Sequence, residues 1–157
     1  MLLTPHTMVG VSVAYMLQNP LIAPPLSLLL HFVGDVLPHW DFYTHTTKEQ
    51  KTTGWRPLAV MADFGLGIAV GLTATLYAMW VLRDTTLALT VFLSGIMSVL
   101  PDVLTGPSIY MKNANSVFKK MHELQRTLNT SASLVVGVLT QLVVVGVSIV
   151  LLVGSLR

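Results

Sequence analysis

Histidine and aspartate residues gather near the end of an apolar stretch in the first third of the chain. His31 and Asp35 stand four residues apart, so both project from one face if the stretch is helical. Pro38 then ends that helix, which sets His39 and Asp41 in the following turn. Imidazole and carboxylate groups without cysteine suit zinc, manganese or non-haem iron. The pattern therefore predicts a divalent metal ion as cofactor, with zinc or manganese as our expectation.

The composition indicates an integral membrane protein with a single domain, residues 1–157. Of these residues, 53% are hydrophobic and 10% are charged, whereas about 25% are charged in a soluble globular domain. The mean hydropathy is +0.70. The net charge of +2 reports membrane topology, so no nucleic-acid partner is expected. The absence of cysteine excludes disulfides and thiolate ligands.

Five apolar segments predict an all-α helical membrane bundle. They are residues 4–18, 21–37, 58–82, 86–100 and 131–154. Pro38 and Pro101 are expected to end the second and the fourth. The first is short for a crossing, which takes about 20 residues, so we expect four to five membrane-embedded helices. A short amphipathic helix over 117–128 should lie on the membrane surface, and Gln141 should serve packing in the last segment.

An up-and-down threading of these segments places most positive charges on one side. That side holds the N-terminus and the loops 38–57 and 102–130. Its seven Lys and Arg residues are Lys48, Lys51, Arg56, Lys112, Lys119, Lys120 and Arg126. The other side has Arg83 and Arg157. The positive-inside rule therefore predicts that the first side faces the cytoplasm.

The same threading brings the ionisable residues of the helices to the cytoplasmic side. The candidate metal ligands are His6, His31, Asp35, His39, Asp41, Asp63 and Asp102. Charged groups at membrane depth are costly and usually face a cavity or one another, and helical bundles build metal sites from such inward-facing side chains. A metal ion with an open position lowers the pKa of a bound water toward neutrality. This predicts a hydrolase, with Asp35 or Asp63 as general base.

Structural explanations stay open for these residues. His31 and Asp35 could hold two helices together by a hydrogen bond, and Asp102 could cap a helix. His6 could be an interfacial residue, and His39 and Asp41 could be solvated; Asp63 within an apolar helix has few such explanations. His45 and His122 are expected at the surface.

Residues 4–43 resemble a known family. The pattern is an early histidine and glycine, then H-x-x-x-D that runs into a proline and an acidic ending, here His6, Gly10, His31, Asp35, Pro38 and Asp41. It resembles the inner-membrane metal-dependent hydrolases, also called LexA-binding, inner-membrane-associated hydrolases. The resemblance implies a small helical protein of a bacterial or archaeal inner membrane. It also implies a metal centre in which the four matched His and Asp residues are ligands.

The sequence departs from that family in two places. His39 stands where such proteins often have an aspartate, and their later histidine-rich motif has its nearest counterpart at residues 121–124. We therefore expect Asp63 and Asp102 to complete the site in place of that motif.

We expect a membrane-embedded metal-dependent hydrolase. A cavity at headgroup depth meets membrane lipid first, which favours an ester or phosphoester of a lipid or lipid-linked molecule as substrate. A divalent-cation or proton transporter would need polar residues on the far side, where the sequence offers little beyond Thr73, Thr75, Ser94 and Gln141. A non-catalytic scaffold with a basic 112–126 surface is the third class. The sequence leaves the oligomeric state open, a homo-oligomer included.

Overall fold

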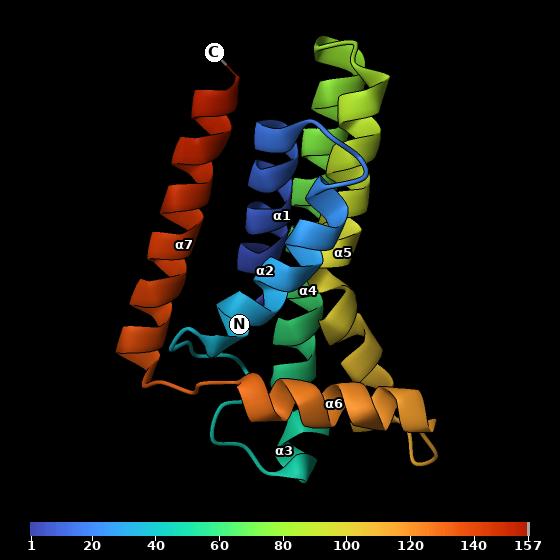
Figure 1. Cartoon of the computed structure of the whole chain (residues 1–157). Coiled ribbons are helices and arrows are strands. Elements are labelled where there is room, and N and C mark those ends of the chain that lie inside the picture. The colour runs from blue at the N-terminus through green and yellow to red at the C-terminus, as the bar shows by residue number, and fades with distance from the viewer. Residues whose placement is uncertain (157) are drawn as a thin grey trace.

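The structure is a computed structural model that describes residues 1–156, and it is all-helical. The helices are α1 (Leu3–Leu17), α2 (Ala23–Val36), α3 (Lys48–Thr52), α4 (Arg56–Leu76), the π-helical turn η1 (Tyr77–Val81), α5 (Thr85–Tyr110), α6 (Ser116–Leu128) and α7 (Leu134–Ser155). The long helices run up and down, and α6 lies across their lower ends (Figure 1). This arrangement follows the predicted threading, and Arg157 lies outside the described residues.

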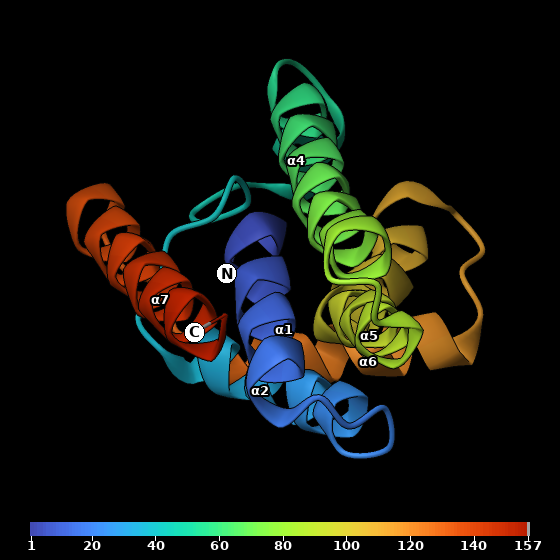
Figure 2. The same ribbon diagram turned by 90° about the horizontal axis from the view of Figure 1, so that it is seen from above.

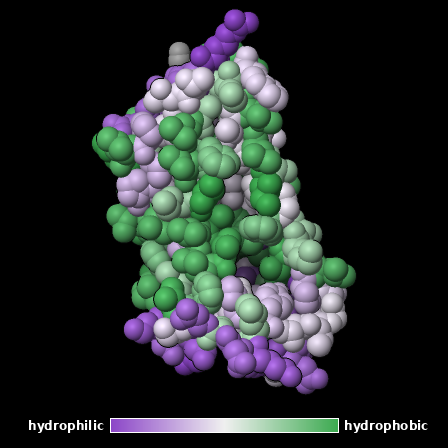
Figure 3. All heavy atoms as spheres, turned by 90° about the vertical axis from the view of Figure 1, so that its right-hand side faces the viewer, coloured by the Kyte–Doolittle hydropathy of each residue, from purple (hydrophilic) through white to green (hydrophobic). Residues whose placement is uncertain are grey.

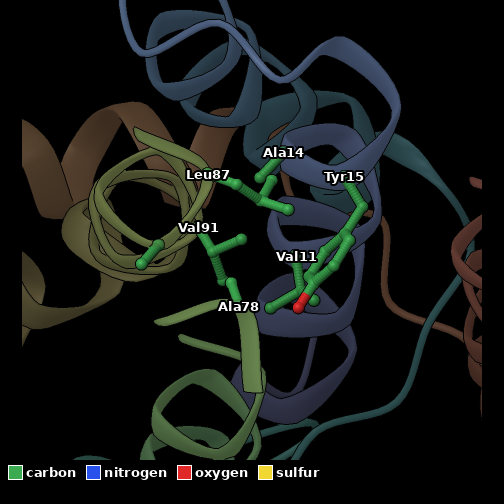
Figure 4. Close-up of a cluster of buried hydrophobic side chains, with 7 residues drawn as sticks. Val11, Ala14, Tyr15, Ala78, Leu87 and Val91 are labelled. Atoms are coloured by element: carbon green, nitrogen blue, oxygen red, sulfur yellow. The ribbon is translucent and has the colours of Figure 1, made fainter. Parts of the chain in front are cut away.

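Helix α1 is the centre of the bundle. It packs against α2, α4, α5 and α7, which surround it when seen from above (Figure 2). Gly10 permits the close approach of α5, because a Cβ there would lie 2.7 Å from the Ser94 carbonyl oxygen. Toward the upper end, a small apolar core joins α1 to α5 and η1 (Figure 4). Its buried residues are Val11, Ala14, Tyr15, Ala78, Leu87, Ala88 and Val91.

Three helical stretches among residues 1–156 are long and apolar enough to cross a membrane. They are Arg56–Val81, Thr85–Tyr110 and Leu134–Ser155. Helices α1 and α2 are shorter, at 15 and 14 residues. The face formed by α4 and α5 carries an apolar band between hydrophilic ends (Figure 3). These features indicate a membrane protein, while the number of embedded helices stays a prediction.

Helix α5 is longer than predicted. We expected the fourth segment to end at Pro101, but α5 continues through Pro101 and Pro107 to Tyr110. A proline in a helix removes one backbone hydrogen bond and need not end the helix if other contacts support the next turn. Here the Thr105 hydroxyl donates to the Pro101 carbonyl at 3.0 Å, and the extension packs on α6. Asp102 therefore lies within a helix instead of a loop.

The polar connections contain two short helices at the lower end. Helix α6 confirms the amphipathic helix predicted at 117–128. Helix α3 was not predicted; Thr47 and Gln50 form a capping box at its start.

Helix α7 is fixed to the loop that follows α2. The Gln141 amide donates to the Trp40 carbonyl at 2.8 Å, and its oxygen accepts from the Leu2 N–H at 2.9 Å. These bonds confirm the predicted packing role of Gln141. At Gly137 a Cβ would lie 2.2 Å from the Trp40 backbone nitrogen. The loop backbone thus lies directly on the α7 surface.

We expect Gly137→Ala to lower the free energy of unfolding by about 1–3 kcal/mol, the usual cost of overpacking, because backbone atoms stand where the new methyl group would lie. Gly146→Ala on the same helix is the control, since its Cβ would meet open space. The control should be neutral or stabilising by up to about 1 kcal/mol through helix propensity. Denaturant unfolding in detergent measures both, and equal stabilities would contradict the close approach.

Candidate metal centre

Three helices bring four of the candidate ligands together at the lower end of the bundle. His6 comes from α1, His31 and Asp35 from α2, and Asp102 from α5. The His6 and His31 rings are stacked, with centroids 4.0 Å apart, and each residue is 1% exposed. One ligand atom each from His6, His31 and Asp102 lies within 4.8 Å of the others. This spacing could hold a single metal ion.

Asp35 lies beside both imidazoles. Its Oδ1 is 3.2 Å from His6 Nε2, and its Oδ2 is 3.2 Å from His31 Nε2. The residue is 2% exposed, so its charge is removed from water and needs close polar partners. Asp35 thus fixes both rings relative to each other.

The orientation of His31 is set by the backbone of α5. Its Nδ1 lies 2.8 Å from the Ser98 carbonyl oxygen, which can only accept, so we assign the Nδ1 proton to this bond. Nε2 faces Asp35 and Asp102, whose oxygens lie at 3.2 and 3.8 Å, and it is the ring nitrogen that would be free to bind a metal ion. A backbone carbonyl bonded to one ring nitrogen is a common arrangement in metal-binding histidines.

Gln125 of α6 completes the polar contacts of this cluster. Its amide donates to His31 Nε2 at 3.0 Å and to Asp102 Oδ1 at 2.6 Å, and its oxygen accepts from the Thr105 hydroxyl. The residue is 8% exposed. Gln125 therefore contacts two residues of the possible metal group, His31 and Asp102.

We did not predict a role for Gln125, although its position in the sequence indicates a buried side chain. It lies four residues after Met121 and three before Leu128, on the apolar face of the amphipathic helix. A polar side chain within an apolar stripe indicates a buried partner. Nothing in the local sequence identifies that partner as His31, 94 residues away.

The second carboxylate oxygen of Asp102 is unsatisfied. Asp102 Oδ2 is buried and has no hydrogen-bond partner among residues 1–156. Buried polar atoms are nearly always paired, so an unpaired one calls for an explanation such as an ion. The donor set, two imidazoles and a carboxylate without cysteine, also fits a divalent cation such as zinc or manganese.

His39 lies next to this group, but both of its nitrogens have other partners. Nδ1 lies 2.9 Å from the Leu37 carbonyl oxygen. Nε2 accepts from the Asn129 amide at 3.1 Å and lies 2.7 Å from the Met1 amino nitrogen, which also contacts Asp35 Oδ1 at 2.8 Å. Burial first, and then the positive Met1 amino group, lower the pKa of His39. His39 is therefore neutral and acts as an acceptor, and its role as a ligand stays a prediction.

Asp41 organises the turn after α2. Its Oδ1 accepts from the Tyr43 N–H at 2.7 Å and from the Thr44 hydroxyl at 3.0 Å. Its Oδ2 lies 4.0 Å from His39 Nε2. The structure thus shows a local turn function for Asp41 and places it near, but not within, the three-ligand group.

Asp63 of α4 caps the first turn of α1. Its carboxylate accepts from the Leu3 N–H at 2.6 Å, the Thr4 N–H at 3.2 Å and the Thr4 hydroxyl at 2.6 Å. The first N–H groups of a helix lack intrahelical partners, so this carboxylate satisfies them. Metal binding or catalysis by Asp63 stays a prediction.

A cavity of about 740 Å³ opens beside the metal centre. Its wall includes four carboxylates, two cations and two histidines that we expected at the surface: Asp35, Asp41, Asp63, Asp102, Lys51, Arg126, His45 and His122. A hollow with hydrophilic atoms at its floor is visible at the lower edge of the apolar band (Figure 3). The cavity could therefore admit a polar or charged group to the carboxylate side of the centre.

Comparisons with known proteins gave no match. No family model matches the chain, and neither a curated protein nor a solved structure matches it. The resemblance of residues 4–43 to inner-membrane metal-dependent hydrolases stays a prediction.

Removal of the α1 cap should cost stability without loss of metal. We expect Asp63→Ala to lower the free energy of unfolding by about 1–2 kcal/mol, the upper range for a capping residue, because three donors lose their acceptor. Denaturant unfolding measures the cost. Unchanged stability would show that the cap is dispensable.

His122 should titrate below its ordinary pKa of 6.5. Burial first, and then the positive charges of Lys51 and Arg126, lower the pKa of this imidazole, so it is neutral at pH 7. Lys51→Gln removes one of those charges and should move the NMR titration midpoint of His122 upward. Lys48→Gln, on the same short helix, is the control and should leave it unchanged. Identical midpoints in wild type and Lys51→Gln would contradict the proposed charge effect.

Proposed function

We propose that this chain is an integral membrane hydrolase that acts on a phosphoester with one divalent ion, zinc or manganese, held by His6, His31 and Asp102. The observation that carries the proposal is the buried, unpaired Asp102 Oδ2 in a group whose three ligand atoms lie within 4.8 Å. A cation there would satisfy this oxygen and lower the free-energy cost of burying the neighbouring carboxylates of Asp35 and Asp102. The pattern that resembles inner-membrane hydrolases supports the same class.

The residues around the ion have separate roles in this proposal. When bound, a divalent ion supplies a Lewis acid and promotes deprotonation of water. Asp35 and the Ser98 carbonyl position the imidazoles through their contacts with the ring nitrogens. Lys51 and Arg126 of the cavity wall bind the phosphate oxygens of the substrate.

Hydrolysis requires one proton acceptor on this side of the cavity. The oxygen of water bonds to phosphorus, the bond from phosphorus to the leaving alcohol breaks, and the water proton ends on that alcohol. Both predicted general bases already have partners: Asp35 contacts the Met1 amino group and the two imidazoles, and Asp63 accepts from α1. Asp35 borders the cavity beside the proposed ion, and its role as proton acceptor stays a prediction.

In the membrane, we propose that α1 and α2 are embedded together with the three long helices. Helix α1 packs against α2, α4, α5 and α7. These helices would separate its ends from lipid, so a short helix is acceptable at this position. The basic residues of α3 and α6 lie at the same end as the metal centre, which the positive-inside rule places on the cytoplasmic side of an inner membrane. The substrate is then a lipid or lipid-linked phosphoester at headgroup depth.

The transporter alternative has less support from the packing. Above the metal centre, α1 is sealed against α5 and η1 by Val11, Ala14 and Val91, each at most 1% exposed. A polar path to the far side would have to cross this apolar layer. Flux of metal or protons into proteoliposomes would favour a transporter instead.

Metal content tests the proposal directly. Wild-type protein purified in detergent should bind about one zinc or manganese per chain, and His31→Ala and Asp102→Asn should lower the affinity at least tenfold, because each removes a ligand. Asp63→Asn is the matched control, since it neutralises another carboxylate of the same cavity but should retain the ion. Elution volume and circular dichroism check that each variant is folded.

Activity on a water-soluble chromogenic phosphodiester should follow metal content in these variants. Loss of the ion from His31→Ala should abolish turnover. Absence of metal from the wild type, or equal metal in all variants, would overturn the proposed centre.

A further inference from the structure

A second, apolar groove runs between α4 and α5 above the polar cavity. Its volume is about 240 Å³. Ile68 and Leu72 of α4 and Val91 and Ile96 of α5 are among its lining residues. Gly95 also lines it, and a Cβ at Gly95 would meet open space. The groove therefore offers an apolar surface that these two helices leave unfilled.

The groove and the polar cavity adjoin each other. Leu3, Phe64 and Val103 line both. From this junction, α4 and α5 both extend toward the upper end of the bundle, within stretches long and apolar enough to cross a membrane. The two hollows together thus have a polar part at the metal centre and an apolar part along the bundle.

The dimensions of the groove select its occupant. From Val103 to Val91 the groove extends about 18 Å along α5 at 1.5 Å per residue. This length is close to one leaflet, which is half of a hydrocarbon core about 30 Å thick. A volume of about 240 Å³ is several times smaller than that of an α-helix about 10–12 Å wide over the same length. A single hydrocarbon chain fits where a helix of a second copy does not.

We propose that this groove holds one acyl chain of a glycerophospholipid whose phosphate lies in the polar cavity near Lys51 and Arg126. Asp35 and Asp102 then border the phosphate from the side of the metal centre. The identification of that lipid as the substrate rests on the proposed function, whereas binding of the acyl chain does not.

Lipid binding to a Gly95→Leu variant tests this inference. The new side chain extends into the groove, and leucine favours a helix more than glycine does, so the variant should fold. Gly146→Leu on the exposed face of α7 is the matched control, because its Cβ also meets open space. Protein in detergent is mixed with a small mole fraction of dioleoyl phosphatidylglycerol, and bound lipid is counted by native mass spectrometry.

We expect wild type and Gly146→Leu to bind one lipid per chain and Gly95→Leu to bind it at least tenfold more weakly. All three should retain the same metal content. Dihexanoyl phosphatidylglycerol, whose chains are too short to extend along the groove, should bind weakly and equally to all three. Equal binding of the long-chain lipid to wild type and Gly95→Leu would overturn the inference. It would also be overturned if wild type were a dimer and Gly95→Leu a monomer with unchanged lipid binding, because a second copy would then occupy the groove.

The same samples separate this inference from the proposed function. If long-chain lipid binding depends on Gly95 but the protein contains no metal and hydrolyses no phosphodiester, the hydrolase proposal fails and the acyl-chain site stands. If the soluble phosphodiester is hydrolysed but no long-chain lipid binds, the acyl-chain site fails and the hydrolase stands.

Discussion

The burial of the Asp35 carboxylate is the constraint on which the lower half of this bundle depends. A charged group removed from water is stable only with close polar partners. Two imidazoles from different helices and the Met1 amino group contact it. These contacts hold the start of α1 against the end of α2. The central position of α1 and the alignment of His6 with His31 both follow from this requirement.

The long helices and the shared face of His31 and Asp35 could be predicted from the sequence, because both depend on local spacing. Apolar runs in the sequence predicted α1, α2, α4 and α7. The four-residue interval between His31 and Asp35 predicted that both lie on one face of α2. The lower end of α5 could not be predicted in this way. Its continuation beyond Pro101 is accompanied by contact with α6, a partner distant in sequence.

Long-range pairing explains the remaining differences between prediction and structure. Asp63 is separated from the α1 N-terminus by about 60 residues in sequence, and its capping role appears only when α4 packs on α1. Gln125 likewise reaches His31 only through the crossing of α6. The candidate metal centre and the polar cavity thus share residues whose sequence neighbours give no indication of their partners.

The backbone pairing of His39 with residues 130–132 has a consequence for biosynthesis. The His39 N–H donates to the Thr130 carbonyl at 3.1 Å, and the His39 carbonyl accepts from the Ala132 N–H at 2.8 Å. The loop after α2 therefore cannot complete this pairing until residues 130–132, directly before α7, have been synthesised.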